Sequence, residues 1–163
     1  MLYTGTYELT IDAKNRLCIP ANIRSGMDAE KDGTTFYLVP GNRQGTLSLF
    51  ADKYYERYSE QYHASLTPLA QEKEDFEELF YAMSVLLEVD KQGRVVLAQR
   101  LLDFAGLSGP VTLTGARDHL VLWSRADHET FIQQRQHEYA DLLRRARQQT
   151  MGPTTGSDVR GGH

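Results

Sequence analysis

LTIDAKNRLCI at residues 9–19 recurs as LEVDKQGRVVL at residues 87–97, and this repeat decides the fold. In both copies an alternating apolar run meets a polar turn with an aspartate and an arginine, and a second alternating run follows. The copies align without a gap, so that Asp12 falls on Asp90 and Arg16 on Arg94, 78 positions later. Alternation with a period of two is typical of β-strands that have one buried face. The repeat therefore predicts two similar β-hairpins with cationic tips in an internally pseudo-symmetric protein.

The residue types in the two turns suit their positions. Asn15 and Gly93 occupy the same place in the two copies, and asparagine and glycine best tolerate a positive φ. Asp12 and Asp90 can accept hydrogen bonds from backbone N–H groups of the turn, or they can orient the arginine. We therefore expect these four residues to shape the turns that present the two arginines.

Each predicted hairpin leads into a short helix and then into a second pair of strands. The first helix begins at Pro20, a residue suited to the start of a helix, and ends near Gly26. The second helix ends at Gly106, which suits a C-cap. The expected second strand pairs are residues 36–39 with 46–50, and residues 111–114 with 119–123.

Helical segments follow both repeat units. Tyr55, Tyr58, Tyr62 and Leu66 recur at helical spacing, which is more typical of a packing face than of a platform for stacked bases. We expect Thr67-Pro68 to interrupt this helical segment and Ser124 to cap the helix after the second repeat. The acidic run at residues 72–78 is expected to be a solvated helix face, with a basic partner or DNA mimicry as the alternatives. The expected organisation is repeat 1 at residues 6–53, a helical linker at 54–83, repeat 2 at 84–127, a C-terminal helix at 128–151 and a disordered tail at 152–163.

The composition is that of an ordinary globular protein, with 40% hydrophobic and 25% charged residues among 163. No apolar run approaches the roughly 20 residues that cross a bilayer, and no secretory signal is present at the start. A single cysteine, Cys18, excludes an internal disulfide. We therefore expect a cytoplasmic protein without a membrane partner.

The charge and the site-forming residue types restrict the function. A net charge of −4 argues against indiscriminate coating of nucleic acid, but specific binding depends on where the cations lie. The five histidines show no metal-ligand spacing, and the chain has no glycine-rich phosphate loop and no nucleophile elbow. Cys18 alternates within a predicted strand, so we expect a small strand residue there and not a nucleophile. We therefore expect no enzyme, no cofactor, no metal and no small-molecule substrate.

Together these motifs resemble the bacterial MraZ proteins, which belong to the SpoVT/AbrB class of swapped-hairpin DNA-binding domains. The resemblance spans roughly the first 147 residues. It is specific because two matching motifs occur at the right separation in the same context. The residues concerned are Thr4-Gly5, the Asp-x-Lys-x-Arg-Leu-x-Ile-Pro run from Asp12 to Pro20, the Asp-x-x-Gly-Arg run from Asp90 to Arg94, Ala-Gly-Leu at 105–107 and Trp123.

The resemblance implies a mainly β fold with flanking helices (α+β), in which two AbrB-like swapped-hairpin halves form a pseudo-twofold double-split β-barrel. It also implies homo-oligomeric rings that bind repeated promoter boxes in double-stranded DNA. The function it implies is nucleoid-associated autorepression of a gene cluster for cell division and cell-wall synthesis. Matched to the family motif, the DNA-binding positions are Lys14, Arg16, Lys91 and Arg94.

Three alternatives remain open on the sequence alone. The arginines could merely solvate two turns. The chain could be a protein-interaction scaffold of the same fold, which the acidic run at 72–78 and Thr4, in place of a common arginine, would favour. An antitoxin is the third alternative, because other swapped-hairpin proteins have that role.

Overall fold

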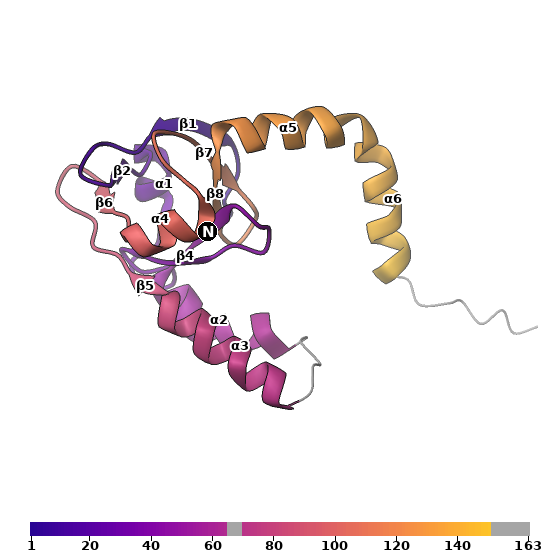
Figure 1. Ribbon diagram of the computed structural model, residues 1–163, viewed down its shortest axis with the longest axis horizontal. Helices are drawn as coiled ribbons and strands as arrows, with labels where there is room; N and C mark the ends of the chain where they lie inside the picture. Colours follow the sequence, from indigo (N-terminus) through magenta and orange to yellow (C-terminus); the bar gives the residue numbers. More distant parts are fainter. Residues whose placement is uncertain (65–69, 151–163) are drawn as a thin grey trace, which may run out of the picture. The chain divides into compact units, whose positions relative to one another are not determined.

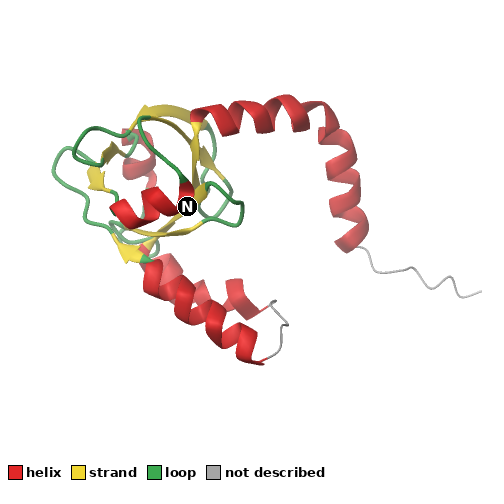
Figure 2. Cartoon of the chain, viewed as in Figure 1, coloured by secondary structure: helices red, strands yellow, loops and turns green. Residues whose placement is uncertain are grey.

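The computed structural model describes residues 1–64 and 70–150, which divide into two compact units, Met1–His128 and Glu129–His163. The strands all lie in the first unit, and the second is helical where it is described (Figures 1 and 2). None of the described helices is long and apolar enough to cross a membrane. The predicted disordered tail and the predicted helix break at Thr67-Pro68 lie outside the described residues.

The fold is mainly β with flanking helices, as predicted. Six antiparallel strands form an open sheet in the order β1-β7-β8-β4-β3-β5, and β2 and β6 form a separate two-stranded pair. The sheet is not closed, so the barrel stays a prediction. The strands are β1 (Thr6–Thr10), β2 (Arg16–Cys18), β3 (Phe36–Pro40), β4 (Thr46–Ala51), β5 (Val85–Leu86), β6 (Arg94–Val96), β7 (Pro110–Gly115) and β8 (Leu120–Ser124).

Strand pairing joins the two repeats. Strand β1 pairs with β7 of the second repeat, and β5 pairs with β3 of the first. The register is the same in both pairings. Glu8 lies opposite Thr112, and Leu86, the counterpart of Glu8, lies opposite Tyr37, the counterpart of Thr112. In the β2–β6 pair, Leu17 lies opposite Val95, its own counterpart in the repeat. Each repeat therefore completes the sheet of the other.

The prediction of two hairpins is wrong in its strand pairing. The strands on either side of each loop do not form a ladder with each other. They meet only at the base of the loop, where the Asp12 N–H donates to the Arg16 carbonyl at 3.0 Å and the Asp90 N–H to the Arg94 carbonyl at 2.9 Å. An isolated bridge between Val89 and Val95 adds to the second base. Beyond the base, each strand that flanks a loop pairs with a strand of the other repeat. A local alternating pattern cannot specify such a partner.

The core lies between the two-stranded pair and the sheet. Leu17, Ile19, Val95 and Leu97 are at most 1% exposed, and they pack in one cluster with the inward-facing leucines of β3, β4, β7 and β8. Helices α1 (Ala21–Gly26) and α4 (Gln99–Ala105) add residues such as Ile23 to this cluster. Helix α4 ends as predicted, with Gly106 in the left-handed conformation at φ 66°.

A helical pair lies beside the sheet. Helices α2 (Asp52–Ala64) and α3 (Ala70–Met83) are linked by a hydrogen bond between Tyr81 and Ser59. Tyr55 is buried and stacks on Phe50 at 4.6 Å between ring centres, as a packing face requires, whereas Tyr58 is 36% exposed and departs from the predicted face. The predicted continuation of that face at Tyr62 and Leu66 lies outside the described side chains.

The C-terminal segment is not one continuous helix. Helix α5 (Arg125–Arg135) is followed by a 3-10 turn (Gln136–Glu138) and by helix α6 (Tyr139–Thr150). The Ser124 hydroxyl accepts the Asp127 N–H at 3.1 Å and caps the start of α5, as predicted. Arg135 and Glu138 form an ion pair of 2.8 Å across the 3-10 turn, whose three-residue period brings such positions together.

The β2–β6 pair at the junction of the repeats predicts that substitutions on its two faces change the free energy of unfolding by different amounts. Leu17→Ala should lower the free energy of unfolding by about 2–5 kcal/mol, because it leaves a cavity in the core. Val96→Ala, at a side chain that is 61% exposed, is the control; it should cost no more than about 1 kcal/mol. Urea unfolding followed by circular dichroism measures both, and equal costs would contradict this account of the core.

Candidate nucleic-acid interface

The first loop is organised by one carboxylate. Asp12 Oδ1 accepts the backbone N–H groups of Lys14 at 2.9 Å and of Arg16 at 2.8 Å. Its other oxygen, Oδ2, accepts Arg16 Nε at 2.7 Å. The sequence offered two roles for this aspartate, shaping the turn or orienting the arginine. In the structure the same carboxylate makes both sets of contacts.

The second loop repeats this bonding atom for atom. Asp90 Oδ1 accepts the N–H groups of Gln92 at 2.8 Å and Arg94 at 3.0 Å, and Oδ2 accepts Arg94 Nε at 3.0 Å. The backbone has a positive φ at the matching position of each loop, 60° at Asn15 and 80° at Gly93. Two sequences with few identical residues therefore build the same cationic loop.

The loops differ in what lies behind this position. Asn15 Nδ2 donates to Gln99 Oε1 at 2.8 Å, so the first loop is tied to the start of α4. At Gly93 a Cβ atom would overlap the guanidinium of Arg24, whose Nε donates to the Ile19 carbonyl at 3.1 Å. Asparagine therefore suits the first loop, whereas a side chain at position 93 would displace the Arg24 guanidinium from the second.

The two loops are held together by the exchange of backbone hydrogen bonds. The Ile19 N–H donates to the Gly93 carbonyl at 2.9 Å, and the Leu97 N–H donates to the Asn15 carbonyl at 2.8 Å. With the β2–β6 ladder between them, the loops emerge at the same end of the first unit (Figure 1). The structure therefore combines the two predicted cationic tips into one site.

The outward side of the β2–β6 pair is the arginine face, made of Arg16, Cys18, Arg94 and Val96. Leu17 and Val95 point the other way into the core. Arg16 lies opposite Val96, and Arg94 lies opposite Cys18. The arginines are thus diagonal neighbours, a relation that separates two residues by about 7–8 Å in an antiparallel pair. Their side chains are 30% and 32% exposed, and Lys14 and Lys91 are exposed at the loop tips.

The electrostatics keep both aspartates charged and both arginines aimed. The Arg16 backbone N–H, followed by the Arg16 side chain and the Lys14 N–H, lowers the pKa of Asp12, and the equivalent groups lower the pKa of Asp90. Each arginine uses only Nε for its aspartate. Within the described part of the chain, the terminal amino groups of Arg16 and Arg94 make no hydrogen bond, so they remain available as donors.

Arg24 is a candidate that sequence reasoning missed. It belongs to α1 in the first repeat, yet its guanidinium lies against Gly93 in the second loop. It therefore adds a third guanidinium at the second loop. Its position in the chain, eight residues after Arg16, gives no indication of this contact because only the pairing of β2 with β6 produces it.

The described residues contain no group of three or more histidine, cysteine or acidic side chains placed to hold a metal.

The paired loops match the double motif of one family. The family model described as "MraZ protein, putative antitoxin-like" matches residues 2–77 and 80–149. The chain belongs to the MraZ family.

Curated relatives across bacteria agree with this membership. Each of three such relatives is named "Transcriptional regulator MraZ". The protein of Mycoplasmopsis pulmonis is 31% identical over 131 residues, 80% of this chain and 84% of the relative. The Acetivibrio thermocellus protein is 32% identical over 133 residues, covering 80% and 86%. The Bifidobacterium longum protein is 28% identical over 141 residues, covering 86% and 89%. The resemblance to MraZ proteins predicted from the motifs is therefore confirmed.

The aspartate-centred bonding predicts how the MraZ loops respond to acid. Because folding lowers the pKa of Asp12 and Asp90, their contribution to stability is present above the ordinary aspartate value of 3.8 and is lost as pH falls through the lowered value. In an NMR titration, the amide signals of Arg16 and Arg94 should therefore shift with midpoints below 3.8. In Asp12→Asn only the Arg94 signal should still titrate, and midpoints at or above 3.8 would contradict the bonding scheme.

Proposed function

We propose that this chain is a sequence-specific DNA-binding transcriptional regulator, an autorepressor of a gene cluster for cell division and cell-wall synthesis. Its target is a set of repeated promoter boxes in double-stranded DNA. One observation above all supports this proposal. The pairing of β2 with β6 puts Arg16 and Arg94 side by side on one outward face, each oriented by its own aspartate.

The arginine face has the shape and chemistry for the major groove. A two-stranded ribbon fits that groove, and an arginine can donate two hydrogen bonds to O6 and N7 of guanine. A separation of about 7–8 Å between the arginines spans about two base-pair steps of roughly 3.4 Å each. Arg16 and Arg94 would therefore contact base pairs two steps apart, while Lys14 and Lys91 neutralise phosphates beside them. Asp12 and Asp90 would stay behind the arginines as positioning residues.

Assembly is part of the proposal. A single copy with a net charge of −4 offers few phosphate contacts, so it would bind DNA weakly. A ring of copies would present several arginine faces to several boxes, and such linkage raises avidity by about 10²–10⁴. The pairings of β1 with β7 and β3 with β5 support two interleaved swapped-hairpin halves with pseudo-twofold symmetry, which together would form the double-split barrel. Such a regulator would act in the cytoplasm, at the nucleoid.

A protein-interaction scaffold is the second candidate, and the charge of α3 favours it. This helix contains five acidic residues and one lysine, and its acidic side chains would repel phosphates. Salt separates the two functions. DNA binding by a regulator falls steeply with salt because it depends on phosphates, whereas a scaffold shows no salt-sensitive preference for promoter DNA.

Removing both arginines should weaken specific binding. Each bidentate arginine–guanine contact is worth about 1–3 kcal/mol, so Arg16→Ala with Arg94→Ala should weaken operator binding about 30-fold or more. Arg117→Ala is the matched control, because this arginine also lies at an exposed turn with a positive φ, 73°. That turn follows Gly115, at the opposite end of β7 from Pro110, which pairs with Thr10 beside the first loop. Fluorescence anisotropy with promoter DNA measures all three proteins, and unchanged affinity in the double variant would exclude the arginine face.

Cys18 reports occupancy of the arginine face directly. It is the only cysteine in the chain, it is exposed, and it lies opposite Arg94. Saturating operator DNA should slow the alkylation of Cys18 by a maleimide, because DNA on this face covers the thiol. A scrambled duplex should protect less, and the double arginine variant should show no protection at the same DNA concentration. An alkylation rate that operator DNA leaves unchanged would place the DNA elsewhere.

A further inference from the structure

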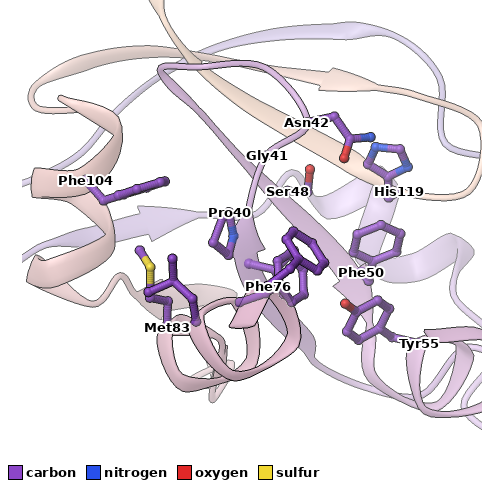
Figure 3. A pocket seen from close by; sticks show the side chains of 13 residues that line it. Pro40, Gly41, Asn42, Ser48, Phe50, Tyr55, Phe76, Met83, Phe104 and His119 are labelled. Atoms are coloured by element: carbon purple, nitrogen blue, oxygen red, sulfur yellow. The ribbon is translucent and has the colours of Figure 1, made fainter. Parts of the chain in front are cut away.

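The first unit has an apolar groove on its surface. The residues that line it include none of the arginine face. We call it the aromatic groove; it has a volume of about 420 Å³ between α3, the β3–β4 turn and α4. Its walls are Phe76 and Leu79 of α3 and Phe104 of α4. Figure 3 shows Phe76 and Phe104 on these two helices. Leu79 is 66% exposed and Phe104 60%, and both line the same groove, so its rim presents apolar surface to solvent.

The floor of the aromatic groove is a stack of rings. Phe50 stacks on Tyr55 and on His119, with ring centres 4.6 Å apart in both pairs (Figure 3). The His119 ring is held by Asp118 at 2.8 Å. The groove is therefore preformed. A small molecule on this floor would leave Leu79 and Phe104 at the rim in water, whereas a helix laid along the groove would cover both.

The rim of the groove is acidic. Glu72 and Asp75 are exposed and lie one helical turn before Phe76 and Leu79, on the same side of α3. The other acidic residues that point to solvent, Glu74 and Glu78, lie on the opposite side of this helix. An occupant that matches both the rings and the rim is an amphipathic helix with a basic border.

Helix α6 has that chemistry. Tyr139, Leu142, Leu143 and Ala146 follow helical spacing along one stripe, and all four are exposed. Arg145 and Arg147 border the stripe on its two sides, and the helix contains three arginines against one aspartate. An exposed apolar stripe with a basic border therefore occurs in the same chain as an exposed apolar groove with an acidic rim.

We propose that helix α6 of one copy docks in the aromatic groove of a second copy. Leu142 and Leu143 cover the rings and the walls, and an arginine beside them faces Glu72 and Asp75. The inference rests on the homo-oligomer part of the proposed function and names the interface. Because the groove and the helix are different surfaces, the contact is head-to-tail, and such contacts produce rings when their rotation closes.

A complementation experiment tests the docking. The wild-type chain should form an oligomer in size-exclusion chromatography with light scattering, whereas Leu79→Glu and Leu143→Glu should each give the 18.5 kDa monomer. An equimolar mixture of the two variants should give a dimer, because one variant keeps an intact helix and the other an intact groove. Both positions are exposed, so circular dichroism should show that each variant is folded.

Charge reversal tests the rim with a matched control. Glu72→Lys with Asp75→Lys should raise the protein concentration needed for half-maximal assembly at least tenfold. Adding Arg145→Glu with Arg147→Glu should restore the wild-type concentration. Glu74→Lys with Glu78→Lys changes the charge of α3 by the same amount on its other side, so that pair should leave assembly unchanged.

Two results would overturn the proposal. A monomeric wild-type chain would exclude docking between copies, and a Leu143→Glu variant that keeps the wild-type mass would assign the groove to another occupant. Titration of promoter DNA with the same samples separates this failure from that of the proposed function. DNA binding that persists with an α6-independent assembly refutes only the interface, and assembly through α6 without specific DNA binding refutes only the regulator.

Discussion

The structure depends on the antiparallel pair that β2 and β6 form at the junction of the two repeats. Leu17 and Val95 lie opposite each other with their side chains in the core, so burying one repeat's strand requires the other repeat. The same pairing turns Arg16 and Arg94 outward as diagonal neighbours. Stability and the proposed DNA contact therefore come from a single ladder, since alternation puts one set of side chains on each face.

The aspartates make this arrangement useful for recognition. Asp12 and Asp90 each satisfy two backbone N–H groups and hold one guanidinium by Nε, which removes rotational freedom from the arginine before any ligand arrives. The cost is that each loop contains a negative charge beside its positive one. A site of this kind gains selectivity from geometry more than from net charge, which is consistent with the proposal that this acidic protein acts as an assembly.

Local features could be predicted from the sequence, and non-local ones could not. The C-terminal end of α4, the Ser124 cap and the matching loops followed from turn residues and alternation, because these act over a few neighbours. The pairing of β1 with β7 did not follow, since alternation indicates which face is buried but not which strand lies beside it. The contact of Arg24 with Gly93 and the exposure of Leu79 depend on that tertiary arrangement, so no pattern in the sequence indicates them.

The most direct measurement of the central claim is a binding titration of the purified protein with the DNA just upstream of its own gene. It should be run at low and at physiological salt, beside a scrambled duplex of equal length. We expect tighter binding to the promoter duplex at both salt concentrations. The logarithm of the association constant should fall against the logarithm of the salt concentration with a slope of roughly 0.9 per phosphate neutralised. Equal binding to both duplexes, or none, would contradict the account and leave the scaffold as the better description of this MraZ protein.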